Sequence, residues 1–226
     1  MLDTGIIRDS LPLLATGAAL TLQLAGVSLV LATAVAIPLA FQRRGAHCTV
    51  TATLAAWSFV MRGTPLLVQI YILYYGLPQI DAVRASMVWP LLRDPVGCAI
   101  LAITLNASAY LMELFAGAIA AVPRGEIEAA KSLGLGRWQR TRLVVLPRAA
   151  RMVLPAYGNE VVLTLKATSL ASTITLMELT GSARIIVSRT YAPYEVFVAA
   201  ALIYLASSLA ITGVIGLLAG RDRSVA

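Results

Sequence analysis

The chain has 226 residues, of which 59% are hydrophobic and only 13% are charged, and its formal net charge at pH 7 is +7. Soluble globular domains carry about 25% charged residues, and a helix that crosses a bilayer needs about 20 mostly apolar residues. Uncharged stretches of this order occur at 10–42, 63–80, 95–112 and 196–220. They exclude a soluble domain and indicate an integral membrane protein.

Five hydrophobic segments follow one another along the chain, at about 11–41, 54–77, 96–121, 155–177 and 196–218. We therefore predict an all-α integral membrane fold in which residues 1–226 form a single domain with five transmembrane helices. Proline disfavours helix at the residue before it, so Pro95, Pro123 and Pro147 are expected to mark helix boundaries. The one long connection between the segments covers 122–151.

The basic residues are distributed unequally between the two sides of this topology. Eleven lie on one side, seven of them in the long connection and the others at Arg43, Arg44, Arg221 and Arg223; five lie on the other side. Since cytoplasmic connections of membrane proteins are enriched in Lys and Arg, we expect the N-terminus outside and the C-terminus in the cytoplasm. This bias accounts for most of the positive charge, so no nucleic-acid partner is expected.

The long connection has the pattern of two short helices. Glu126 and Glu128 are expected to begin the first one, where acids complement the positive helix N-terminus, and Gly134 to end it in a left-handed conformation. Residues 137–146 then form a second, basic helix, which Pro147 is expected to stop. This pattern fits either a basic loop at the lipid headgroups or a compact helix that is presented to a partner.

The motif of this connection resembles the EAA loop of ABC importer permeases, through Glu128, Ala129, Ala130, Gly134, Val144, Leu146 and Pro147. The only departure is valine at Val144, where isoleucine is usual. The resemblance implies a type I ABC importer-like fold and a cytoplasmic coupling helix that docks on an ATPase subunit. Glu128 would contact the ATPase, the two alanines would allow close approach, and Gly134 would permit the sharp turn.

Other stretches resemble the polar amino acid branch of these permeases, at 62–69, 74–78, 109–113, 115–119, 154–160 and 165–170. Within this branch the chain is most similar to the M-type subunits of histidine/lysine/arginine/ornithine and of octopine or nopaline permeases. Ala167 occupies a position where many relatives carry an acid, so no role of that acid transfers to this chain.

Charged residues at membrane depth are costly and are functional candidates by default. Arg62 and Glu113 lie at similar predicted depths, at 1.5 Å per helical residue. We therefore predict a structural ion pair between Arg62 and Glu113.

A second polar group lies on the fourth segment and comprises Asn159, Glu160, Lys166, Thr168 and Ser169. Lys166 falls about 9 Å further outward than Glu160, and seven residues separate Asn159 from Lys166, which puts these two on one helix face. We expect this group to line a translocation path where the fourth segments of two subunits meet, with Glu160 suited to an ammonium or guanidinium group. Alternatively, Glu160 pairs with a basic or backbone group and holds the subunit interface.

The sequence contains no phosphate-binding Gly-x-x-x-x-Gly-Lys-Ser/Thr motif, no metal-ligand spacing and no base beside a nucleophile. We therefore expect a protein that is not an enzyme and that binds no metal or cofactor, with ATP and Mg²⁺ held by a partner.

The resemblance implies a permease subunit that imports polar amino acids, basic ones or opines among them, across the bacterial inner membrane. Its expected partners are a cytoplasmic ABC ATPase dimer, a second identical or homologous permease subunit, and a periplasmic or lipid-anchored solute-binding protein. The main alternative is a stand-alone secondary transporter, although such folds commonly show repeats with broken helices. A channel or membrane scaffold is the third possibility, but it would not explain the motif of the long connection.

Overall fold

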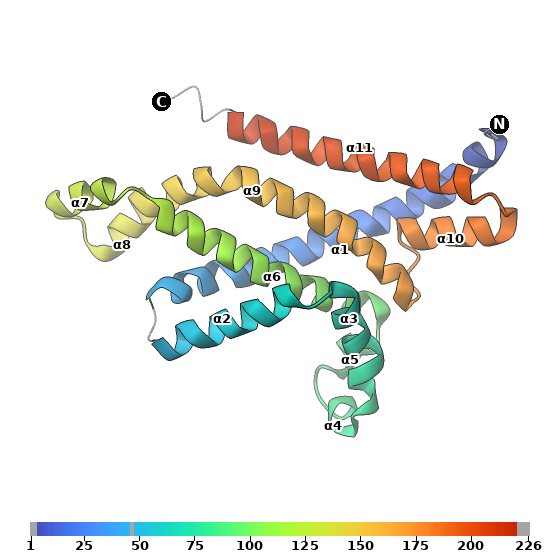
Figure 1. Cartoon of the computed structure of the whole chain (residues 1–226), viewed down its shortest axis with the longest axis horizontal. Coiled ribbons are helices and arrows are strands. Elements are labelled where there is room, and N and C mark those ends of the chain that lie inside the picture. Colours follow the sequence, from blue (N-terminus) through green and yellow to red (C-terminus); the bar gives the residue numbers. More distant parts are fainter. Residues whose placement is uncertain (1–3, 46–47, 221–226) are drawn as a thin grey trace.

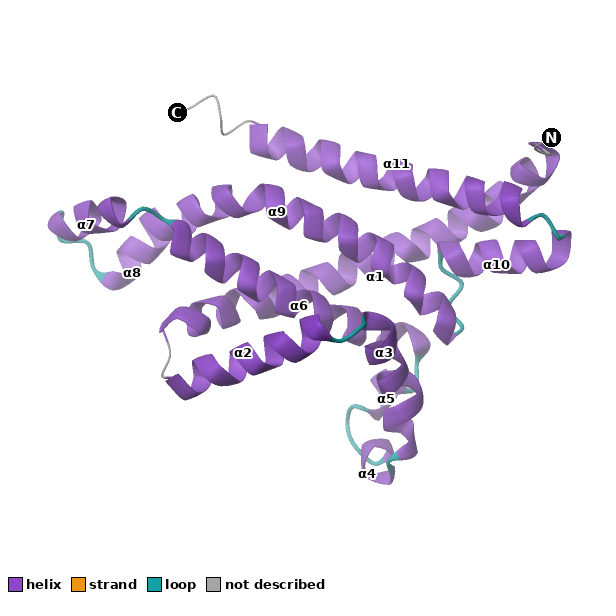
Figure 2. Ribbon diagram, viewed as in Figure 1, coloured by secondary structure: helices purple, strands orange, loops and turns teal. Residues whose placement is uncertain are grey.

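The computed structural model describes residues 4–45 and 48–220, and all regular secondary structure in these ranges is helical (Figure 2). Arg221 and Arg223, which contribute to the predicted orientation, lie outside the described residues, as does His47, the one histidine of the sequence, for which no chemical role is expected. The elements in chain order are α1 (Thr4–Gly45), α2 (Cys48–Gly63), α3 (Leu66–Tyr71), η1 (Ile72–Gly76), η2 (Leu77–Gln79), α4 (Asp81–Arg84), α5 (Trp89–Leu92), α6 (Pro95–Ala121), α7 (Arg124–Ser132), α8 (Arg137–Arg140), η3 (Thr141–Val145), α9 (Leu146–Ala167), η4 (Thr168–Ile174), α10 (Leu179–Thr190) and α11 (Pro193–Gly220).

Three of the described helices are long and apolar enough to cross a bilayer: α1, α6 and α11. Two further helix pairs pass the same test but are bent, by 99° between α2 and the α3–η2 run and by 49° between the α8–η4 run and α10. The number of spans is therefore between three and five, depending on whether each bent pair counts as one. The second predicted segment, 54–77, is accordingly not one straight helix.

The centre of the fold is the contact between α1 and α6 (Figure 1). Ala32, Ala36 and Ala40 are fully buried and repeat every four residues, so they lie on one face of α1. That face packs against Leu111 and Met112 of α6. Within a bilayer the hydrophobic effect does not drive helices together, and small residues allow their backbones to approach closely enough for van der Waals packing. This explains why alanines form this interface.

The sharp break between α2 and α3 is stabilised by two side-chain amides. Pro65 has no N–H, so it cannot donate to the carbonyl of Met61 four residues earlier, as the helical pattern would require. Gln69 Nε2 donates to this carbonyl at 2.8 Å and Asn106 Nδ2 donates to it at 2.9 Å. Asn106 also donates to Gln69 Oε1 at 3.2 Å. Membrane helices tolerate a break where neighbouring side chains satisfy the freed backbone groups in this way.

The fourth predicted segment begins earlier than expected. Pro147 does not stop the helix that precedes it; it occupies the first turn of α9, where a missing N–H is tolerated. The π-helical turn η3, Thr141–Val145, lies directly before it, and such turns often accommodate a distortion inside a longer helix. The helical run therefore continues from Arg137 to Ile174, and the boundary expected at residue 155 falls within α9.

Helices α9 and α11 approach closely. A Cβ atom added at Gly158 of α9 would lie 2.8 Å from the Ile215 side chain of α11. One crevice adjoins this contact and a second lies nearer the end of α9, and they place the polar side chains of Asn159 and Lys166 toward α11.

Candidate functional site

The long connection projects at one end of the molecule (Figure 1), where α1 and α6 end and α9 begins. Gly134 has a φ of +77°, and the amides of Gly134 and Leu135 donate to the carbonyls of Lys131 and Ala130 at 3.0 and 3.1 Å. These two bonds form the Schellman motif that ends α7. The predicted helix end and its left-handed glycine are confirmed.

The EAA residues have different environments on α7. Glu128 and Ala129 are exposed, whereas Ala130 is buried and packs toward the rest of the chain. Arg148 of α9 lies 3.4 Å from Glu126, between the Nε and Oε1 atoms, and links α7 to α9. Both side chains are substantially exposed, so this pair contributes little to the stability of the fold.

Two large apolar side chains beside the Gly134 turn were not singled out by the sequence analysis. Leu133 is 81% exposed and Trp138 is 71% exposed. Large exposed apolar patches rimmed by polar residues are typical of interaction surfaces, and these two side chains make the turn a candidate for one. The signal was present in the sequence as a tryptophan between basic residues, at Arg137 and Arg140.

The predicted ion pair between Arg62 and Glu113 is not the pair that the structure contains. Arg43 Nε lies 3.3 Å from Glu113 Oε1, and the Arg62 guanidinium lies over the Tyr110 ring, 5.2 Å from its centroid. Arg62 also interacts electrostatically with Glu160. The prediction compared only how deep Arg62 and Glu113 lie in the membrane. It could not show that the last turn of α1, which carries Arg43, faces Glu113 of α6.

The predicted path residues of α9 and η4 divide between two sides. Asn159 lines a cavity of about 320 Å³ against α11, and Lys166 and Ser169 line a second one of about 460 Å³. Glu160 instead is within electrostatic reach of Arg62. Thr168 is fully buried and its hydroxyl donates to the Leu165 carbonyl at 2.7 Å, so within the chain it has a structural role.

Glu178, which the sequence analysis did not select, is fully buried between η4 and α10. Its carboxylate accepts hydrogen bonds from the amides of Thr180 and Gly181 at 3.0 and 2.9 Å, and it caps α10. It also accepts from the hydroxyls of Tyr204 at 2.9 Å and Thr21 at 3.3 Å. Four donors compensate the loss of water around the charge, and Glu178 therefore joins α1, α10 and α11.

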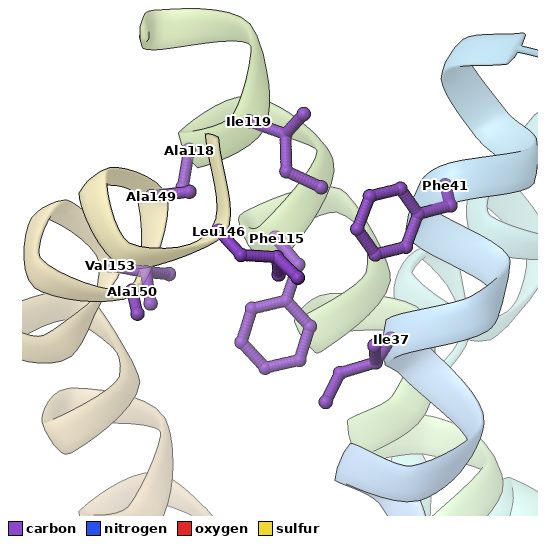
Figure 3. Close-up of a pocket in the computed structure, with 9 residues that line it drawn as sticks. All are labelled: Ile37, Phe41, Phe115, Ala118, Ile119, Leu146, Ala149, Ala150 and Val153. Carbon is purple, nitrogen blue, oxygen red and sulfur yellow. The ribbon is translucent and has the colours of Figure 1, made fainter. Parts of the chain in front are cut away.

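A further cavity of about 130 Å³ lies between α1, α6 and α9 (Figure 3). Figure 3 shows Phe41 and Ile37 of α1 across from Phe115 of α6, with Val153 on the α9 side. Its lining consists of apolar side chains only. It therefore has no group that could orient a charged substrate.

No cluster of three or more His, Cys, Asp or Glu side chains that could hold a metal ion occurs in residues 4–45 and 48–220.

Comparison with known proteins gives consistent results over nearly the whole chain. A family model of binding-protein-dependent transport system inner membrane components matches residues 32–223. The chain is 47% identical to the octopine transport system permease protein OccM of Rhizobium radiobacter over 203 residues. The alignment covers 90% of this chain and 83% of that protein. It is 41% identical over 191 residues to the histidine/lysine/arginine/ornithine transport system permease protein HisM of Salmonella typhimurium, with 84% and 81% covered.

Among solved structures, the fold is similar to a chain in the crystal structure of an amino acid ABC transporter with histidines. The TM-score is 0.87 at 30% sequence identity, and the match covers 98% of this chain and 99% of that one.

Proposed function

Because this chain belongs to the family of binding-protein-dependent transport system inner membrane components, we propose that it is the permease subunit of an ABC importer of basic amino acids or opines. The observation that carries the proposal is the 47% identity to the octopine permease over 90% of this chain. The similarity to the histidine/lysine/arginine/ornithine permease supports the same class of substrate, which is a polar amino acid with a cationic side chain.

Helix α7 is the coupling helix in this proposal and docks on a cytoplasmic ABC ATPase. The exposed Glu128 is available for a polar contact, and Leu133 and Trp138 offer apolar area beside it. The Glu126–Arg148 pair then transmits a displacement of α7 to α9. ATP and Mg²⁺ are bound by the ATPase and not by this chain.

The chain spans the inner membrane five times, with each bent helix pair counted as one span, and its C-terminus lies in the cytoplasm. Arg43 and Arg44 end α1 at the same end of the molecule as the basic α7–α8 connection. This grouping supports the orientation, because Lys and Arg are enriched on the cytoplasmic side. The N-terminus then lies outside, where a solute-binding protein delivers the substrate.

The translocation path runs along α9 and is completed by a second permease subunit, either identical or homologous. Asn159, Lys166 and Ser169 face the crevice toward α11. Glu160 lies on another face of α9 than Lys166, where it can contact the cationic side chain of a substrate or an element of the second subunit.

The proposal is tested by uptake of labelled arginine into proteoliposomes that contain the permease, its ABC ATPase and its solute-binding protein. Uptake should require ATP, should stop with an ATPase variant that cannot hydrolyse ATP, and should be competed by lysine, ornithine or octopine but not by glutamate. Uptake that persists without the ATPase and follows an ion gradient would instead identify a stand-alone secondary transporter.

A further inference from the structure

The apolar cavity between α1, α6 and α9 (Figure 3) opens to the surface of the molecule. Two of the side chains that line it, Ile37 of α1 and Leu146 of α9, are 44% and 37% exposed. Its volume is about 130 Å³, and apolar cavities of roughly 150 Å³ stay free of water and bind apolar guests. In a bilayer the apolar guest that is present in excess is the acyl chain of a lipid.

The lining runs along the helices and not across them. On α9 it includes Leu146, Ala150 and Val153, which share one helix face and extend over about 10 Å at 1.5 Å per residue. On α1 it includes Ile37 and Phe41, which are one turn apart. An acyl chain in a bilayer lies in the same direction as the helices that cross the bilayer, so the shape of the cavity suits it.

Two arginines lie one turn beyond this lining, toward the end of the molecule that carries the long connection. Arg44 follows Phe41 by three residues on the last turn of α1. Arg142 precedes Leu146 by four residues on η3. Residues at these spacings lie on nearly the same helix face. Both arginines are exposed, and no carboxylate within residues 4–45 and 48–220 lies within 4.0 Å of either one.

We propose that the cavity binds one acyl chain of an anionic phospholipid whose phosphate contacts Arg44 and Arg142. Basic residues between membrane helices bind anionic lipid headgroups, and guanidinium groups donate paired hydrogen bonds to phosphate oxygens. Glu113, the acid next to this site on α6, is paired with Arg43, which reduces its repulsion of the headgroup. The inference goes beyond the transport function and requires only that the chain lies in a membrane.

The test measures how the intact permease–ATPase complex retains lipid. The delipidated complex is titrated with phosphatidylglycerol or with phosphatidylcholine, and the bound lipids are counted by native mass spectrometry. The wild type should bind phosphatidylglycerol saturably and in preference to phosphatidylcholine. Its midpoint of thermal unfolding should also rise with phosphatidylglycerol, because a ligand that binds only the folded state stabilises it.

Ala150→Leu tests the acyl-chain site, because it places a larger side chain in the cavity from an exposed position on α9. It should weaken the binding of both lipids by about tenfold or more, since it displaces much of the buried chain, and should abolish the rise in the unfolding midpoint. Ala156→Leu is the matched control, because Ala156 is exposed on the same helix and does not line the cavity. The control should bind both lipids as the wild type does.

Arg44→Gln and Arg142→Gln test the headgroup contact. Each should lower the preference for phosphatidylglycerol about fivefold, as for the loss of one basic residue at a lipid surface, and the double variant should lower it further. Arg93→Gln removes the same charge before α6, at the opposite end of that helix from the cavity. This control should keep the wild-type preference.

An unchanged preference in both Arg44→Gln and Arg142→Gln would overturn the headgroup contact, and unchanged lipid binding in Ala150→Leu would overturn the acyl-chain site. If Ala150→Leu instead separates the two permease subunits and leaves lipid retention as it was, the second subunit fills the cavity and the proposal is wrong. These results are independent of ATP-driven arginine uptake by the wild type, which tests the transport function by itself.

Discussion

The side-chain amide of Asn106 donates a hydrogen bond to the carbonyl of Met61 at 2.9 Å, at the position where Pro65 has no N–H to offer. This bond connects α6 to the 99° break between α2 and α3. The backbone break after α2 is thus stabilised by a residue 45 positions further along the chain, on another helix.

Asn106→Leu should destabilise the complex by about 1–3 kcal/mol, because a polar group that is removed from a buried network leaves its partners unsatisfied. The measurement is the midpoint of thermal unfolding of the purified complex. Gln79→Leu is the control, since the Gln79 amide donates to the Tyr75 carbonyl on an exposed surface and its loss should have little effect. Equal midpoints for both variants would contradict the role of Asn106.

Glu178→Ala should destabilise the complex by roughly 1.5–3 kcal/mol or more, because it removes the acceptor of four hydrogen bonds at a buried site. Glu195→Ala, which removes an acid from the first turn of α11, serves as the control and should change the unfolding midpoint much less. Limited proteolysis near residues 175–190 should also accelerate in Glu178→Ala. A variant as stable and as protected as the wild type would rule out the joining role of Glu178.

Glu113 should couple energetically to Arg43 and not to Arg62. A double-mutant cycle of Arg43→Ala and Glu113→Ala should give an interaction energy of about 0.2–1 kcal/mol, as for partly exposed ion pairs. The cycle of Arg62→Ala with Glu113→Ala should be additive. The opposite result, coupling to Arg62 alone, would restore the pairing expected from the sequence.

Gly134→Ala should lower ATP-driven uptake while substrate binding in the absence of ATP stays unchanged. Alanine at a φ of +77° is strained by roughly 1 kcal/mol, and the space around Gly134 is open, so the effect comes from the backbone alone. Gly136→Ala is the control, because its φ of −62° suits alanine. Uptake that is equally reduced in both variants would show that the left-handed turn is not the cause.

The sequence predicted the features that depend on local chemistry. Uncharged stretches indicated membrane helices, and the position of Gly134 indicated the end of α7, which its φ of +77° confirms. The family resemblance was confirmed by relatives at 41–47% identity.

The features that depend on which helix faces meet were not accessible from the sequence. The sequence predicted Arg62 as the partner of Glu113, whereas the packing of α1 on α6 brings Arg43 to it. Glu178 was not selected from the sequence, because only the convergence of α1, α10 and α11 buries it. Pro147 was expected to stop a helix because proline disfavours helix at the residue before it, whereas the helical run continues through the π-helical turn that precedes it.

The central claim is that α7 couples this permease to an ATPase, and the most direct test is co-purification of the ATPase with Glu128→Arg. Because Glu128 is exposed on α7, the variant should fold normally, lose most of the bound ATPase and lose ATP-driven uptake. Asp81→Arg, at another exposed acid on α4, should retain both. Full association and undiminished uptake in Glu128→Arg would contradict the account.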